Sequence, residues 1–219
     1  MSPVQPTLRL ERRLWAEQRV VVACDEVGRG ALAGPVVIGA TVMAPRSRRV
    51  RIPEGLRDSK LIPEARRADV ARAAEAWVDA SALGWASAAE IDAVGITRAL
   101  GLAAHRALDG LRSQGVDMSG AVVLLDGNHD YISPAGATPY EVRTVIKGDR
   151  DCASAAAASV VAKVARDAHM VALHPAAPAY LWERNKGYAS PEHRAAIAAH
   201  GLHAHHRASW QIAAAPTLF

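Results

Sequence analysis

The sequence predicts an α/β fold in which a mixed central sheet is flanked by helices. Short β-branched runs dominate the first part of the chain, and strand and helix patterns alternate in the rest. Strands joined by a short turn pair antiparallel, whereas strand–helix alternation is typical of parallel strands, so the sheet should contain both kinds of pairing. The chain has 219 residues, half of them apolar, which is enough for one domain with a sizeable core.

Three strands and two helices are expected in the first half, where alternating and helical spacings of apolar residues follow one another. The expected strands are residues 19–24, 36–43 and 77–86, and the expected helices are residues 63–77 and 96–111. The first two strands are joined by the segment DEVGRGALAGP, whose glycines and proline indicate a turn. A polar, arginine-rich loop should separate the second strand from the first helix.

Strands and helices alternate in the second half. The expected strands are residues 121–125 and 141–146, and the expected helices are residues 153–173 and 191–200. The tail that follows is rich in histidine. The simplest division gives an N-terminal extension (1–18), a main domain (19–173) and a small helical C-terminal portion packed on it (174–219).

Charge and cysteine content narrow the class of protein. The chain carries 26 Lys and Arg against 22 Asp and Glu, and its sequence pI is about 9.4, which is compatible with an anionic polymer as partner. No apolar run reaches the roughly 20 residues that span a bilayer, and residues 1–13 lack the apolar core of a secretory signal. Cys24 and Cys152 have neither metal-site nor disulfide spacing, which favours a reducing compartment, so we expect a cytoplasmic protein. Because no apolar run is long enough to span a bilayer, we expect no membrane partner.

Acidic residues follow three of the expected strands. Asp25 and Asp126 come directly after theirs, and Asp149 comes three residues after the last one. Ligand sites of open α/β sheets gather at the carboxyl ends of strands, so these acids can converge. Converging carboxylates repel one another and are costly to bury unless a cation neutralises them. Hard oxygen ligands suit Mg²⁺ or Mn²⁺, and two such ions can catalyse phosphodiester hydrolysis.

Each acid also has an ordinary structural interpretation. A single Asp after a strand is more often a turn former, and Asp151 near Asp149 could cap the following helix. Glu26 could pair with Arg29 across the turn. Periodicity alone leaves the metal-site and structural interpretations open.

Glycines beside the acid pair Asp25–Glu26 add a second feature. The Gly28-Arg29-Gly30 segment has little side-chain bulk, so its backbone amides can approach a sugar–phosphate chain closely. The ribose 2′-hydroxyl separates RNA from DNA, and closely approaching backbone groups can recognise it. A GxG pattern on its own is more often just a tight turn.

The sequence resembles ribonuclease HII. The resemblance starts at Asp25-Glu26-Val27-Gly28-Arg29-Gly30 and continues, in order, over most of residues 19–210. The further matching segments are, in chain order, Asp58-Ser59-Lys60-Leu61; Leu125-Asp126-Gly127; Lys147-Gly148-Asp149; the helix that contains Ser159, Lys163, Arg166 and Asp167; Lys186-Gly187-Tyr188; His193; and His206-Arg207 with Ser209. Arg29 favours ribonuclease HII over the neighbouring family, ribonuclease HIII.

The resemblance implies a ribonuclease H-like fold and a metal-dependent endoribonuclease. It implies cleavage of the RNA strand of RNA/DNA hybrids and incision 5′ to single ribonucleotides embedded in duplex DNA, leaving 3′-hydroxyl and 5′-phosphate ends, as in ribonucleotide excision repair. Carried over by position, the catalytic and metal-binding acids are Asp25, Glu26, Asp126 and Asp149. We expect Mg²⁺ or Mn²⁺ in a two-metal site, and a monomer.

Substrate contacts are assigned by the same resemblance. The Gly28-Arg29-Gly30 segment would read the 2′-hydroxyl, and Tyr188 would pack on the sugar to the 3′ side of the ribonucleotide. Basic side chains should line a phosphate track, although an ordinary solvated face is an alternative. The expected members of this track are Lys147, Lys163, Arg166 and Lys186, with Ser159 as either a phosphate contact or a hydroxyl on the helix surface. Lys163 and Asp167 could instead form a simple helix ion pair.

Two other functions stay open at this stage. One is a nuclease of the same fold that acts on another duplex, such as a four-way junction. The other is a hybrid-binding module without catalysis, which the four acids disfavour because a binder gains nothing from negative charge facing phosphate.

Overall fold

A five-stranded mixed sheet forms the centre of the computed structural model, which describes residues 5–17, 19–45 and 51–210. The strands are β1 (Val21–Val27), β2 (Val36–Met43), β3 (Ala80–Ala86), β4 (Val122–Asp126) and β5 (Glu141–Val145), in the spatial order β3-β2-β1-β4-β5. The first three strands form an antiparallel meander, while β4 and β5 run parallel to β1. The predicted mixed α/β architecture is therefore confirmed.

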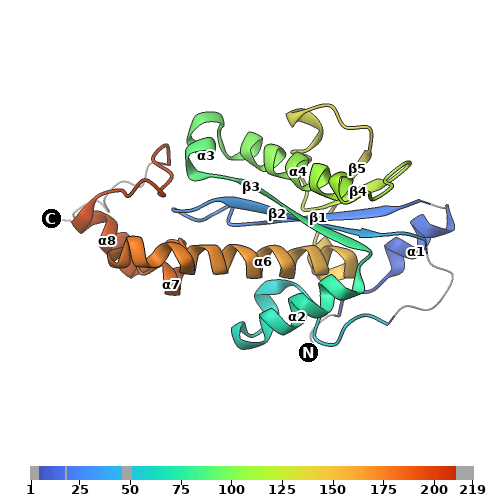
Figure 1. The fold of residues 1–219 in the computed structure, drawn as a ribbon, viewed down its shortest axis with the longest axis horizontal. Helices are drawn as coiled ribbons and strands as arrows, with labels where there is room; N and C mark the ends of the chain where they lie inside the picture. Colours follow the sequence, from blue (N-terminus) through green and yellow to red (C-terminus); the bar gives the residue numbers. More distant parts are fainter. Residues whose placement is uncertain (1–4, 18, 46–50, 211–219) are drawn as a thin grey trace.

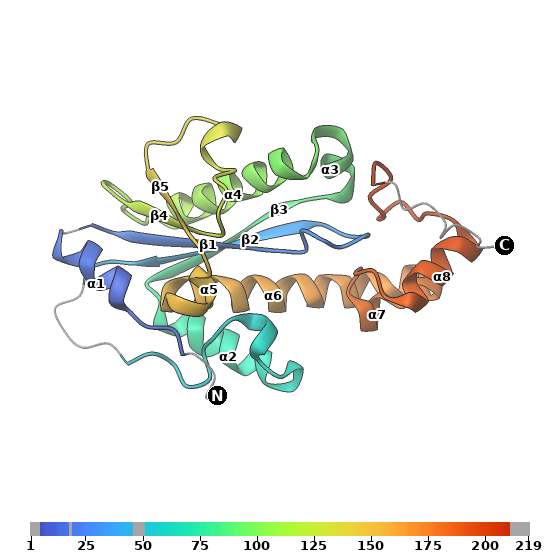
Figure 2. The ribbon, with the colours of Figure 1, turned by 180° about the vertical axis from the view of Figure 1, so that it is seen from behind.

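Helices cover both faces of this sheet (Figure 1). Their bounds are α1 (Arg9–Ala16), α2 (Glu64–Trp77), α3 (Ala88–Val94), α4 (Ile96–Ser113), α5 (Gly148–Asp151), α6 (Ala153–Leu173), α7 (Trp182–Asn185) and α8 (Pro191–His200). Helices α3 and α4 lie on one face; α6 crosses the other, with α2 packed against it. The view from behind shows the same layers, with α5 at the start of α6 (Figure 2).

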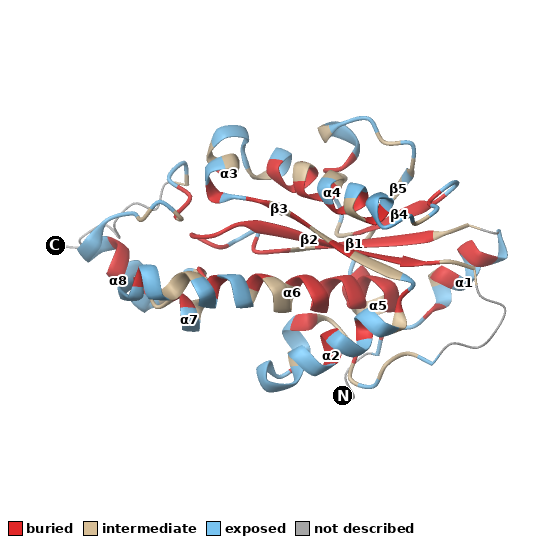
Figure 3. Ribbon diagram, viewed as in Figure 1, coloured by how far each residue is buried: buried red, intermediate tan, exposed pale blue. Residues whose placement is uncertain are grey.

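Small residues bring the helices close to the sheet. A side chain at Gly39 of β2 would place its Cβ 2.3 Å from the Ala158 carbonyl oxygen of α6. On the other face, a Cβ at Gly84 of β3 would lie 1.8 Å from the Ala103 carbonyl oxygen of α4. The alanine-rich helices present little bulk there, and β1, β2 and β4 are buried along most of their length (Figure 3). Small residues at these contacts let the helices approach the sheet closely.

The segment before β1 contains helix α1, which the sequence patterns did not predict. Its Leu14 and Trp15 are buried in the core on the α6 face. Glu11 is also buried, and its carboxylate accepts hydrogen bonds from the backbone amide (3.0 Å) and the hydroxyl (2.7 Å) of Ser154 in the first turn of α6. This carboxylate thus satisfies an orphan donor at the helix N-terminus.

Helix α3 was also missed, although its sequence carries a start signal. The Ser87 hydroxyl accepts from the Glu90 amide, and the Glu90 carboxylate accepts from the Ser87 amide, which together form a capping box. The S-x-x-E pattern at 87–90 could have revealed the helix.

The C-terminal helices form their own small apolar cluster against the end of α6. Tyr180, Trp182 and Ile197 pack there with Met170 of α6 and Leu32 of the β1–β2 connection. The proposed division of the chain at residues 18 and 173 stays a prediction. Of the helices in the described residues, none has the length and apolar character needed to cross a membrane.

Replacing Gly84 with alanine should destabilise the protein by about 1–3 kcal/mol, because the new Cβ would collide with the backbone of α4. Gly110→Ala is the matched control at the same interface: its Cβ would lie 3.1 Å from the Ala82 Cβ, and alanine favours the helix. Urea denaturation should show a clear decrease in the free energy of unfolding for Gly84→Ala and little or none for Gly110→Ala. Equal effects would contradict this account of the packing.

Candidate active site

Asp25 and Glu26 lie inside strand β1, which corrects the expectation that the strand stops at Cys24. The strand continues to Val27 because β2 keeps pairing with it, Asp25 opposite Gly39 and Glu26 opposite Ile38. Successive side chains of a strand point to opposite faces, so the two acids of the pair face different sides of the sheet. Asp25 is only 4% exposed.

Asp126 ends strand β4 beside Asp25. The last parallel pair of β1 and β4 is Cys24–Leu125, so Asp25 and Asp126 come next in register on neighbouring strands. In-register residues of adjacent strands project from the same face. These two acids are therefore brought together by the sheet itself.

Asp149 lies in the first turn of the short helix α5, after β5, and is buried. Its backbone amide donates to Asp126 Oδ1 over 3.2 Å. Lys147 adopts a left-handed conformation (φ 59°) just before it, and a Cβ on Gly148 would come within 3.2 Å of the same Asp126 oxygen. This turn brings Asp149 back toward the end of β4.

Burial and mutual repulsion both disfavour the charged forms of these acids, and burial is the larger cause. Burial raises the pKa of Asp25 well above its usual range, and the Asp126, Glu26 and Asp149 charges add to the effect, against a hydrogen bond from the Ser159 hydroxyl. Burial and the Asp126 charge also raise the pKa of Asp149 to about 6. Lys60 offsets part of this, with its Nζ 3.9 Å from Asp149 Oδ2.

This donor set fits a hard divalent cation, because carboxylates that raise one another's pKa values gain most when a cation is placed among them. As they stand, however, no three His, Cys, Asp or Glu side chains of the described residues are grouped closely enough to hold a metal ion. The acids would have to shift on binding an ion. Their assignment as ligands remains a prediction.

Two side chains hold Glu26, which faces the opposite side of the sheet from Asp25. The Tyr131 hydroxyl donates to Glu26 Oε2 over 3.0 Å, and Arg29 Nη1 lies 3.2 Å from Oε1. The expected Glu26–Arg29 pair is thus present. Sequence reasoning missed Tyr131, because nothing in the loop after Asp126 signals a contact with Glu26. Burial raises the pKa of Tyr131, so it keeps its proton and can donate.

Two serines and a lysine lie beneath the acids. Ser159 is 1% exposed and shares a 3.0 Å hydrogen bond with the Ser59 hydroxyl, so it is not the surface hydroxyl considered from the sequence. The same hydroxyl hydrogen-bonds Asp25. Asp58 accepts from the Lys60 amide and so caps the short 3₁₀ turn Ser59–Leu61 that carries Lys60. The contact of Ser159 with phosphate stays a prediction, and its side chain faces inward.

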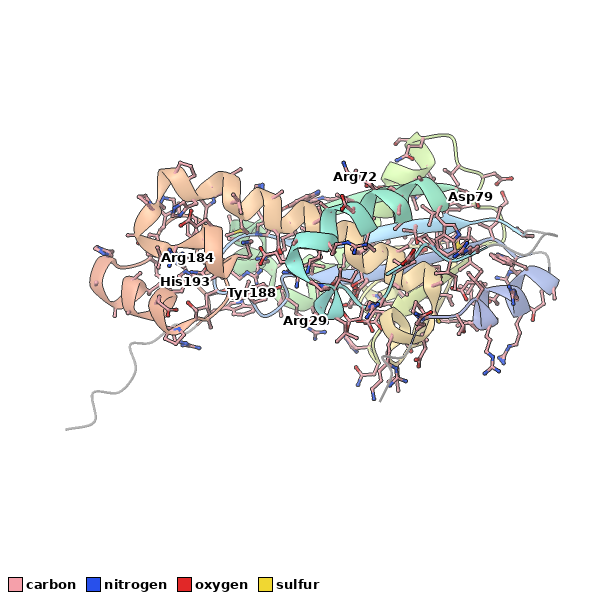
Figure 4. The ribbon with its side chains drawn as sticks, turned by 90° about the horizontal axis from the view of Figure 1, so that it is seen from below. Arg29, Arg72, Asp79, Arg184, Tyr188 and His193 are labelled. Carbon is pink, nitrogen blue, oxygen red and sulfur yellow. The ribbon has the colours of Figure 1, made fainter. Side chains whose placement is uncertain are left out.

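The Gly28-Arg29-Gly30 segment leaves β1 directly beyond the acids. Gly28 has φ +88°, and a Cβ there would lie 2.0 Å from Arg166 Nε, so only glycine fits. Around Gly30 the space is open, with nothing within 4 Å of a Cβ built there. Arg29 is exposed, and Figure 4 shows it on the same side of the molecule as Tyr188.

Tyr188 is half-buried between two cations of α6. Lys163 Nζ lies 5.4 Å and Arg166 Cζ 5.1 Å from its ring centre. The backbone oxygen of Tyr188 lies 2.8 Å from His193 Nδ1, and His193 Nε2 lies 3.0 Å from His206 Nε2. The histidines near the C-terminus therefore support Tyr188.

The predicted phosphate track is only partly exposed. Arg166 is fully buried and donates to backbone carbonyls, so its place on the track was wrong. Lys163 is half-buried and forms the expected pair with Asp167 at 2.8 Å. Lys186 lies 3.4 Å from Glu64, and Lys147 is exposed. Arg166 was misassigned because its helical spacing does not reveal that the β1–β2 connection covers it.

A family model for ribonuclease HII matches residues 22–213. The chain belongs to the ribonuclease HII family. Ribonuclease HII of Streptomyces griseus is 49% identical over 210 residues, a match that covers 94% of this chain and 84% of that one. Membership makes the protein a ribonuclease H, a hydrolase whose family acts on RNA/DNA hybrids.

Solved structures confirm the ribonuclease H-like fold. The ribonuclease HII in a complex with PCNA from Archaeoglobus fulgidus aligns with a TM-score of 0.67 and 21% identity, over 87% of this chain and 95% of that one. Bst-RNase HIII in complex with Mn²⁺ gives the same TM-score and identity, over 87% of this chain and 66% of that one. The fold therefore does not separate the two families, whereas the sequence comparisons do.

The metal-free protein should be less stable at pH 7.5 than at pH 5, and Asp149 should account for part of the difference. The folded protein holds the Asp149 proton up to pH about 6, whereas the ordinary pKa is 3.8, so the free energy of unfolding falls as pH rises between these values. Over the whole interval the effect is about 2–3 kcal/mol, and roughly half of it falls between pH 5 and pH 7.5.

Urea denaturation of wild type and Asp149→Asn in EDTA measures this contribution. The variant should gain stability relative to wild type as pH rises. Asp117→Asn, at an exposed site where hydrogen bonds to Ser119 lower the pKa, is the control and should show no such gain. A constant difference between wild type and Asp149→Asn across this range would mean that the pKa of Asp149 is not raised in the folded protein.

Proposed function

We propose that the protein is a divalent-metal-dependent endoribonuclease that cuts the RNA strand of RNA/DNA hybrids and incises 5′ to single ribonucleotides in duplex DNA. The products would carry 3′-hydroxyl and 5′-phosphate ends. The observation that carries the proposal is the mutually repelling group Asp25, Asp126 and Asp149, placed beside the Gly28-Arg29-Gly30 segment.

The acids would hold two Mg²⁺ or Mn²⁺ ions, which when bound supply an activated water and charge stabilisation for the leaving oxygen. The chain's own part is to hold the carboxylates. Ser159 orients Asp25, the Asp149 amide orients Asp126, and Tyr131 orients Glu26. The Mn²⁺ complex of Bst-RNase HIII, a protein of similar fold, supports the choice of ion.

Ribose recognition would come from the glycine segment and Tyr188. The open space around Gly30 allows a sugar–phosphate chain to approach the backbone. The Tyr188 ring is held by Lys163 and Arg166 on α6, so it can offer a fixed apolar surface to the neighbouring deoxyribose. Lys147 and Lys163 would contact phosphate in this proposal.

This activity suits the first step of ribonucleotide excision repair in the cytoplasm of the cell. We propose that the protein acts as a monomer on the nucleic acid. A relative from Archaeoglobus fulgidus has been solved in complex with PCNA.

Asp126→Asn should abolish metal-dependent cutting, with a loss of at least about 100-fold, while duplex binding changes little, because the substitution removes a ligand charge and keeps the shape. The assay compares duplex DNA with one ribonucleotide against a plain four-way junction, each with Mg²⁺ and with EDTA. Asp130→Asn is the control: Asp130 caps the loop by accepting from the Ile132 and Ser133 amides.

Cutting of the ribonucleotide duplex that persists in EDTA would exclude metal dependence. Preferred cutting of the four-way junction would assign the protein to another nuclease activity. Unchanged activity of Asp126→Asn would remove this residue from the mechanism.

Tyr188→Ala should lose more activity at a single embedded ribonucleotide than on an all-RNA hybrid, because only the first substrate places a deoxyribose next to the ribose that is read. The measurement is kcat/KM on both substrates, with an expected difference of about tenfold between the losses. Tyr140→Ala, a half-buried tyrosine beside Arg112 in another part of the fold, is the control and should affect both equally. Equal losses for Tyr188→Ala would contradict the junction role.

A further inference from the structure

Two buried arginines hold the carbonyls of the β1–β2 connection. Arg207 donates from Nη2 to Gly28 O (2.6 Å), from Nη1 to Arg29 O (2.8 Å) and from Nε to Gly34 O (3.2 Å). It comes from the far end of the described chain, so these bonds join the C-terminal segment to the glycine segment beside the acids.

Arg166 holds the other half of the same connection. It donates from Nη2 to Ala33 O (3.1 Å) and from Nε to Pro35 O (2.9 Å), and its Nη1 reaches Lys186 O (2.9 Å) next to the Tyr188 turn. Its side chain occupies the space where a Cβ on Gly28 would stand. One guanidinium thus links both predicted ribose-reading elements.

Both guanidiniums are fully buried, and burial lowers the pKa of each. Among the described residues, neither forms an ion pair with a carboxylate. Burying an unpaired charge is costly, and here the compensation comes from the carbonyls and from the faces of Tyr188 and Trp210, 5.1 and 4.8 Å from the two charges. The fold thus buries two costly charges under one short connection, which indicates that the connection has to keep one particular conformation.

The inward carbonyls fix where the backbone amides point. In a planar trans peptide the C=O and the following N–H point in opposite directions. Because the carbonyls of Gly28 and Arg29 face Arg207, the amides of Arg29 and Gly30 face away from it. Neither amide donates to a backbone or side-chain acceptor among the described residues, and the space around Gly30 is open.

We propose that Arg207 and Arg166 are positioning residues that aim the Arg29 and Gly30 amides at the ribose and thereby set the preference for a 2′-hydroxyl over a 2′-hydrogen. This rests on the proposed function, since it assumes that the glycine segment reads the ribose. The C-terminal segment reinforces the arrangement, because the Arg207 amide donates to Leu32 O and the Gly34 amide donates to His205 O. The arginines act through the backbone and do not touch the substrate.

The test is a binding ratio measured without cleavage, in full-length protein carrying Asp126→Asn. Affinity is measured for a duplex with one ribonucleotide and for the same duplex made entirely of DNA. Adding Arg207→Lys keeps the charge but removes the multiple carbonyl bonds, so the ribo-to-deoxy ratio should fall by about fivefold or more while affinity for the DNA duplex changes less than about twofold. A purely structural role would weaken both duplexes together.

Arg19→Lys is the matched control, because Arg19 also donates to a backbone carbonyl, that of Gly120, but at the other end of β1. It should leave the ratio unchanged. Trp210→Leu provides a second variant that removes the stacked ring from Arg207 but keeps an apolar side chain against the neighbouring hydrophobic clusters, and it should lower the ratio in the same direction. Thermal melting establishes that each variant is folded at the assay temperature.

The outcomes separate the two proposals. If the Asp126→Asn parent binds both duplexes equally, ribose reading itself fails. If the parent discriminates and folded Arg207→Lys and Trp210→Leu keep the full ratio, the positioning role is overturned. A reduced ratio in both, with Arg19→Lys unchanged, supports it.

Discussion

The cost of burying the Asp25 carboxylate inside the central strand shapes the rest of the site. Asp25 is nearly inaccessible, and the neighbouring Asp126 and Asp149 charges raise its pKa further, so the fold must supply compensation nearby. The Ser159 hydroxyl and Lys60 supply part of it. The remaining negative charge is available to cations, which is the physical basis for proposing a metal-dependent reaction at this edge of the sheet.

Buried positive charge complements this acidic cluster just beyond the carboxyl end of β1. Arg166 and Arg207 sit under the β1–β2 connection, where carbonyl groups and aromatic rings take the place of carboxylate partners. A carboxylate in that position would add to the repulsion that the cluster already carries. Using neutral backbone acceptors leaves the connection with inward carbonyls and outward amides, which suits an anionic, hydroxyl-bearing substrate.

Helix α6 contributes both to the packing of the core and to the candidate active site. Helix α6 lies close to β2 because Gly39 meets its backbone, and that closeness brings Ser159 under Asp25. Four and seven residues further along α6, Lys163 and Arg166 hold the Tyr188 ring, and Met170 anchors the C-terminal helices. The C-terminal segment then returns Arg207 to the loop beside the acids, so both chain halves contribute to one site.

The sequence alone determined the mixed sheet, the order of its strands and helices along the chain and, through its ordered motifs, the ribonuclease HII family. These are local or cumulative properties: periodicity reports which segments are strands, and motifs keep their order whatever the chain does in space. Only the tertiary structure decided that Asp25 lies within a strand, that Tyr131 holds Glu26 and that Arg166 is buried rather than exposed to phosphate. Each depends on a different segment of the chain: β2 for the extent of the strand, the loop after β4 for Glu26, and the β1–β2 connection for the arginine. Helical or strand spacing carries no signal of what will cover a residue, so burial and pairing of these polar groups emerge only once the segments pack.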